Sequence, residues 1–63
     1  MLIQINKTYM YNKIILVKVI SLTKKQVRIC YNLKNDNGYF VKKFSIISKD
    51  QFLKHCEEIN END

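Results

Sequence analysis

The single histidine, His55, stands directly before Cys56, and a cysteine beside a histidine could act as a nucleophile with its general base. Both fall in a predicted helix, where side chains one residue apart point about 100° away from each other. Most carboxylates cluster after residue 56, at the end of a predicted helix that should fray after Ile59, where no pocket could raise their pKa. One glycine excludes the phosphate-binding glycine motifs. We therefore expect a protein without catalytic activity.

The two cysteines, Cys30 and Cys56, do not have the spacing of a zinc site, since the sequence offers neither a second pair nor a set of histidines. They could in principle form a disulfide. The first residues do not resemble a signal peptide, so we favour a cytoplasmic protein with two buried, reduced thiols. No metal and no cofactor is expected.

Charge is divided unevenly along the chain. Residues 1–49 carry ten of the eleven Lys and Arg residues and one acid, whereas residues 50–63 carry five acids and one base. A basic body suggests a nucleic-acid partner, because neutralisation of phosphates supplies most nonspecific affinity. A merely solubilising surface is the alternative. The longest apolar run is far shorter than the ~20 residues of a membrane span, so we expect no membrane partner.

Residues 26–33, QVRICYNL, alternate in polarity and predict a half-buried strand. The following Asn37-Gly38 predicts a type I′ hairpin with a two-residue loop. That register pairs Tyr31 with Phe44 and Ile29 with Ile46. This register places three apolar residues of the following strand in the core: Phe40, Phe44 and Ile46. It also places Lys42 at a rim on the core side and turns Lys43 outward with Arg28 and Asn32.

Residues 13–22 are rich in β-branched residues and predict a central strand covered on both faces. An odd-length loop around Thr23–Lys25 would bring Ile15, Val17 and Val19 into the core and turn Lys18 outward near Arg28. Residues 2–11 predict a first strand that turns at Asn12-Lys13. Short connections then favour a meander.

The spacing of apolar residues changes from that of a strand to that of a helix in SKDQFLKHCEEI, which predicts an amphipathic helix over 48–60. Ser48 is the expected N-cap and Gln51 its capping-box partner. Phe52, Cys56 and Ile59 form the apolar stripe. We expect one domain, residues 1–60, followed by a mobile acidic tail at 61–63. The fold class is α+β, mainly β: a four- to five-stranded antiparallel meander, an SH3-like barrel or a curled sheet, with one C-terminal helix.

A basic sheet face with interleaved aromatic residues would suit nucleic acid, because bases stack on exposed rings. The predicted face has Lys18, Arg28, Asn32 and Lys43 on its outer side, with Tyr9, Tyr11 and Tyr39 available for stacking. Protection of sheet edges and ordinary strand propensity would also explain these residue types.

The segments IILVKVISLTKKQVRICYNL, KNDNGYFVKKF and SKDQFLKHCEEI together resemble the SH3-like small barrels, including Tudor-type modules and the small crenarchaeal chromatin proteins. The likeness is one of architecture. The chromatin proteins imply binding of the DNA minor groove by a sheet face. Tudor-type modules imply a cage of aromatic rings, for which the chain offers Tyr9, Tyr11, Tyr31 and Tyr39.

We therefore expect a noncatalytic small binding module that contacts nucleic acid through a basic sheet face. The alternative is a phage- or plasmid-type accessory protein that binds a host protein and inhibits or adapts it. The small single-domain format, the abundance of Asn, Lys and Ile that suggests an AT-rich coding genome, and the lack of any site motivate that alternative. Open sheet edges would also allow a homodimer.

Overall fold

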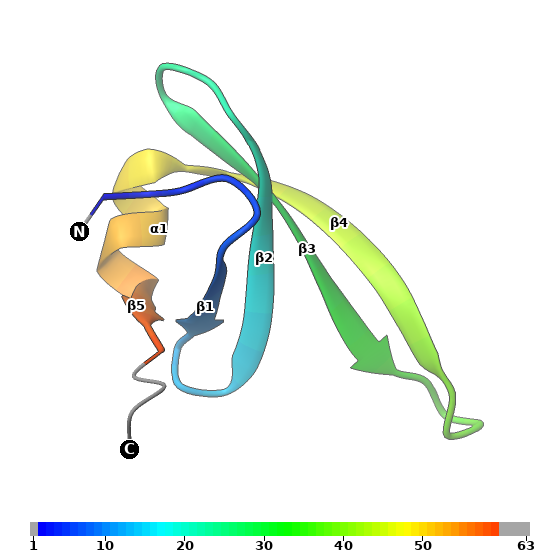
Figure 1. The fold of residues 1–63 in the computed structure, drawn as a ribbon. Helices are drawn as coiled ribbons and strands as arrows, with labels where there is room; N and C mark the ends of the chain where they lie inside the picture. Colours follow the sequence, from blue (N-terminus) through cyan, green and yellow to red (C-terminus); the bar gives the residue numbers. More distant parts are fainter. Residues whose placement is uncertain (1, 60–63) are drawn as a thin grey trace.

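The computed structural model describes residues 2–59, which form one antiparallel sheet and one helix (Figure 1). The order across the sheet is β4-β3-β2-β1-β5, so a four-stranded meander is completed when the chain returns to pair β5 with β1. This confirms the mainly-β α+β class. No helix among the described residues is long and apolar enough to cross a membrane. The elements are β1 (Thr8–Tyr11), β2 (Ile15–Leu22), β3 (Gln26–Lys34), β4 (Phe40–Ser48), α1 (Lys49–His55) and β5 (Cys56–Glu58).

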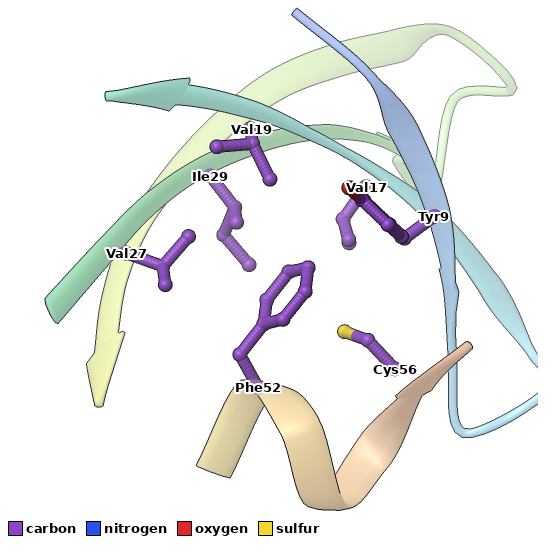
Figure 2. Packing of buried hydrophobic residues seen from close by; sticks show 7 residues of the cluster. All are labelled: Tyr9, Val17, Val19, Val27, Ile29, Phe52 and Cys56. Carbon is purple, nitrogen blue, oxygen red and sulfur yellow. The ribbon is translucent and has the colours of Figure 1, made fainter. Parts of the chain in front are cut away.

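The core lies between the inner, concave face of the sheet and α1 (Figure 2). Phe52 rises from the helix into the centre, and its ring meets that of Tyr9 edge to face at a centroid distance of 5.0 Å. Val17 and Val19 are buried and Ile15 packs against them, which confirms the predicted inward face of β2. The buried hydrophobic residues are Tyr9, Val17, Val19, Val27, Ile29, Phe52 and Cys56.

The β2–β3 loop differs from the predicted one, but the side chains of β2 are arranged as predicted. Thr23 N donates to Gln26 O at 3.0 Å, which closes a two-residue loop rather than an odd one. The register then shifts between Val19 and Ser21, where β2 carries one extra residue. Because such a bulge reverses the alternation of side chains, Lys18 still lies on the outer face, opposite Cys30.

The β3–β4 hairpin differs from the prediction by one residue. Asn35 N donates to Tyr39 O at 2.7 Å, and Gly38 N donates to Asn35 O at 3.0 Å. Gly38 has a φ of +85°, whereas Asn37 is not among the residues with positive φ. A type I turn followed by a left-handed glycine therefore replaces the predicted type I′ turn. The loop holds three residues, 36–38.

This change of one residue turns every side chain of β4 to the other face. Phe44 lies opposite Cys30 and Ile46 opposite Arg28, so both point outward. Phe40, Phe44 and Ile46 are 72%, 63% and 53% exposed, and their predicted place in the core was wrong. Ile47 is the β4 residue that packs against the core instead.

The first strand is shorter than predicted and begins at Thr8. Asn6 has a φ of +69° and its N–H donates to Val19 O at 2.7 Å, which bends the chain before the strand starts. The predicted turn at Asn12-Lys13 is confirmed. Both residues have positive φ, at 51° and 59°, as a type I′ turn requires.

The helix begins as predicted and ends earlier. Ser48 Oγ accepts from Gln51 N at 3.0 Å, which confirms the N-cap. After His55 the chain becomes extended, and Cys56 pairs with Tyr11. Pairing with β5 satisfies the backbone groups along one edge of β1, which a helix continued to residue 60 would have left open. The tail predicted at 61–63 lies outside the described residues.

Candidate nucleic-acid interface

Basic and aromatic side chains meet on the outer face of the sheet, which we define as the side opposite α1. One cross-strand row joins Lys18 of β2, Cys30 of β3 and Phe44 of β4. Arg28 and Asn32 lie two residues to either side of Cys30 and therefore share its face. We call Lys18, Arg28, Asn32, Phe40, Lys42, Phe44 and Ile46 the outer patch.

The structure brings together three of the four polar residues predicted for this surface. Lys18, Arg28 and Asn32 are exposed in the outer patch. Lys43 instead opposes Tyr31 and points to the inner side, so its predicted outward position was wrong. Lys42 takes its place opposite Asn32. The cause is the three-residue hairpin loop.

The predicted stacking tyrosines are not in this patch. Tyr9 is fully buried, and its hydroxyl accepts from Gln4 N at 2.9 Å and donates to Leu2 O at 3.3 Å. Tyr11 is half-buried on the inner side, with its ring 5.5 Å from that of His55. Tyr39 alone of the three is exposed, at 69%, beside the hairpin turn. A stacking role for Tyr9 is therefore excluded in this fold.

Phenylalanines supply the rings that the sequence analysis assigned to tyrosines. Phe40 and Phe44 have the same parity along β4 as Lys42 and lie on its face. The signal for this arrangement was present in the sequence. Asn35 and Gly38 occupy the first and last positions that a type I turn favours, and this turn sets the outward register.

The hairpin projects beyond the core and carries part of the patch with it. Residues 32–44 are all exposed, and the far end of β3 and β4 extends away from the helix (Figure 1). Few groups of the body therefore restrict approach to Phe40 and Lys42. A flexible polymer could lie along β4 without meeting α1.

The cations of the outer patch lack carboxylate partners. Among residues 2–59 the ion pair that the structure shows joins Lys7 Nζ to Glu58 Oε1 at 2.7 Å, and none forms at Lys18, Arg28 or Lys42. The hydrogen bond and the charge of Lys7 lower the pKa of Glu58. Glu57 also lies on the outer face, but it belongs to β5, at the opposite edge of the sheet from β4. Charge on the patch itself is positive.

His55 and Cys56 do not form an activated pair. Cys56 is buried beside Phe52 in the core, and burial raises the pKa of its thiol to about 11. His55 Nδ1 lies 2.9 Å from Asn12 Oδ1 and so has a polar partner of its own. A thiol with so high a pKa is protonated near neutrality and is a poor nucleophile.

A second surface feature is a hollow of about 350 Å³ on the inner side of the sheet. Tyr11, Tyr31, Ser45 and Gln51 bring polar groups to its wall, which is otherwise aliphatic. The aliphatic residues that complete the wall are Ile15, Val17, Ile29 and Ile47.

Comparison of this chain with protein-family models, with curated proteins and with solved structures finds no match. The resemblance to SH3-like barrels therefore stays a prediction.

Proposed function

We propose that this chain binds single-stranded nucleic acid through the outer patch. The observation that carries the proposal is Phe44, an aromatic residue that is 63% exposed and lies in the same cross-strand row as Lys18. An exposed aromatic ring stabilises an unpaired base by about 1–3 kcal/mol through stacking, whatever the sequence. Lys18, Arg28 and Lys42 surround this ring with cations that phosphates can approach.

The geometry favours single strands over a duplex. Phe40 and Phe44 are four residues apart on one strand, or roughly 13 Å, with Lys42 on the same face between them. Flat rings separated by a cation suit a strand whose bases are splayed from its backbone. The base faces of a duplex are already stacked on each other, so these rings could add little there.

Fluorescence anisotropy with labelled single-stranded DNA and RNA, titrated over a range of salt concentrations, tests the proposal. Lys42→Gln and Lys43→Gln are matched variants, because they remove the same charge from neighbouring residues on opposite faces of β4. We expect Lys42→Gln to weaken binding and to reduce the salt slope by about 0.7, the value for one lost phosphate contact. Lys43→Gln should change both much less.

Stacking is tested separately with Phe44→Ala, which should weaken binding of single strands on the order of tenfold or more. Duplex binding should change little. Absence of binding at low salt, or equal effects of the Lys42 and Lys43 variants, would overturn the proposal.

A second candidate function is binding of a host protein, as expected for a phage- or plasmid-type accessory protein. The inner hollow favours it, together with Leu33 and Val41, which are 43% and 37% exposed on the inner side of the hairpin. A nuclease-treated pull-down should then recover one stoichiometric protein with the wild type. The Ser45→Arg variant, which fills the hollow, should lose it. Loss of all partners on nuclease treatment would contradict this candidate.

A further inference from the structure

The sheet has one long edge that no further strand covers. β4 is its outermost strand, with nine residues and a uniform register against β3. It contains neither a proline nor a bulge, and of the devices that natural edge strands use against further pairing it has the lysines, Lys42 and Lys43. The other edge strand, β5, has three residues, of which two are glutamates.

Two hydrogen bonds identify the backbone groups that this edge leaves free. Asn35 N donates to Tyr39 O at one end of the hairpin, and Lys49 N donates to Lys25 O at the other. Bonded and non-bonded pairs alternate in an antiparallel ladder, so the odd-numbered residues of β4 bond to β3. The N–H and C=O groups that point to the free edge belong to Phe40, Lys42, Phe44 and Ile46. Ser48 adds only its N–H, because as the N-cap of α1 it uses its C=O for the first bond of the helix.

We propose that a second copy of this chain pairs with β4 along this edge, antiparallel, about a twofold axis at Phe44. The two Phe44 residues then exchange backbone hydrogen bonds, Lys42 of each copy opposes Ile46 of the other, and Phe40 opposes Ser48. The outward groups of residues 42, 44 and 46 all find partners, because these positions are symmetric about residue 44, and the N–H of Ser48 meets the C=O of Phe40. The two sheets become one continuous sheet of ten strands.

Other centres fit less well. An axis at Lys42 would place two lysines directly opposite each other and leave Ile46 and Ser48 unpaired, and like charges opposed in this way are destabilising. An axis at Ile46 would leave Phe40 and Lys42 unpaired. With the axis at Phe44 the Lys42 side chains are about 14 Å apart, farther than the ~8 Å screening length at physiological salt. The closest lysines are then the two Lys43, diagonal neighbours at roughly 8 Å on the inner face.

The pairing also gives exposed apolar side chains neighbours in the second copy. Phe44 and Ile46, which are 63% and 53% exposed in one copy, become cross-strand neighbours of Phe44 and Lys42 of the other. The outer patches of the two copies then adjoin across the axis. The dimer does not depend on the proposed nucleic-acid binding and is measured without nucleic acid.

Phe44→Lys and Phe40→Lys are the matched test. Both add one positive charge in place of an exposed phenylalanine on the same face of β4, but only the first places like charges at the axis. Analytical ultracentrifugation over a wide concentration range should show a dimer for the wild type and for Phe40→Lys. Phe44→Lys should raise the dissociation constant on the order of tenfold or more.

Circular dichroism verifies that both variants stay folded. A wild type that remains monomeric at every concentration would overturn the proposal, as would equal dissociation of the two variants.

Disulfide trapping tests the register. Cys30 is first replaced by Ser, because it opposes position 44 within the same chain. Residues opposed in a hydrogen-bonded pair have Cα atoms about 5.5 Å apart, within the range a disulfide spans. Mild oxidation of Cys30→Ser/Phe44→Cys should therefore give a covalent dimer, whereas Cys30→Ser/Phe40→Cys should give no covalent dimer. Equal cross-linking of the two, or none in the first, would contradict an axis at Phe44.

Discussion

Cys30 of β3 and Phe44 of β4 lie directly opposite each other on the outer face of the sheet. Lys18 of β2 is the next residue in the same row, two strand spacings, or roughly 10 Å, from Phe44. The row places an exposed ring within reach of a cation that is 26 residues away in the chain. This relationship depends on the registers of both hairpins, because a shift of one residue in either would separate the two side chains.

The hairpin register predicts unequal effects of two asparagine substitutions. Asn35 Oδ1 accepts from the N–H groups of Asn37 and Tyr39, both at 3.0 Å, so Asn35→Ala should destabilise the fold by about 1 kcal/mol. Asn37 does not have positive φ, and Asn37→Ala should cost less than about 0.5 kcal/mol. Urea denaturation measures both. A larger effect at Asn37 would point to the type I′ turn.

The same loop shows why the sequence analysis placed the core correctly in β2 and wrongly in β4. Polarity alternates along β3, so the burial of Ile29 was predicted locally. Val17 and Val19 were predicted from an odd loop that would turn Lys18 outward, and a two-residue loop with a bulge in β2 gives the same burial. The face of β4 depends on whether the loop is odd or even, and Asn37-Gly38 is compatible with both. Aromatic residues at 40 and 44 then favoured the incorrect choice, because burial of rings is the usual outcome.

The C-terminal segment shows a second limit. Ser48, Gln51 and Phe52 predicted the start of the helix and its buried residue, since these signals are local. The end of the helix depends on β1, whose free edge pairs with Cys56–Glu58. No pattern within residues 48–60 indicates that this segment pairs with a strand so far away in the sequence. The outer patch was predicted in its β2 and β3 residues and missed in Phe40, Lys42 and Phe44, because the face of β4 is set by the three-residue hairpin loop.

Phe52 is predicted to be the most sensitive residue in the core. It is fully buried, and its ring contacts Tyr9 edge to face at 5.0 Å. Phe52→Ala should cost about 3–5 kcal/mol, which could unfold a small domain whose total stability is in the range of about 5–15 kcal/mol. Leu53→Ala, at the next and 47% exposed position, is the control and should cost far less. Chemical denaturation measures the stability of both variants. Similar midpoints would contradict this view of the core.

The Lys7–Glu58 ion pair predicts a small acid-dependent loss of stability. The hydrogen bond and charge of Lys7 lower the pKa of Glu58 below its ordinary value of 4.5. A group whose pKa is lower in the folded state stabilises the fold above the unfolded pKa, and this contribution is lost as the pH falls through the folded pKa. Thermal unfolding from neutral pH to below pH 4.5 should therefore decline less steeply for Glu58→Gln than for the wild type. High salt should reduce the difference, because both side chains are partly exposed. Parallel profiles would show that the pair contributes nothing measurable.

The two cysteines are predicted to differ in reactivity. Cys56 is 6% exposed, and burial raises the pKa of its thiol to about 11, whereas Cys30 is only partly buried on the outer face. Because the thiolate is the reactive form, a water-soluble thiol reagent at mildly alkaline pH should modify Cys30 well before Cys56. Denaturant should make both thiols react rapidly. Mass spectrometry of the modified peptides identifies the order, and Cys30→Ser provides the control, since it should leave only the slow phase. Fast modification of Cys56 in the folded protein would mean that β5 separates readily from β1. The packing of Cys56 in the core that Figure 2 shows would then open frequently in solution.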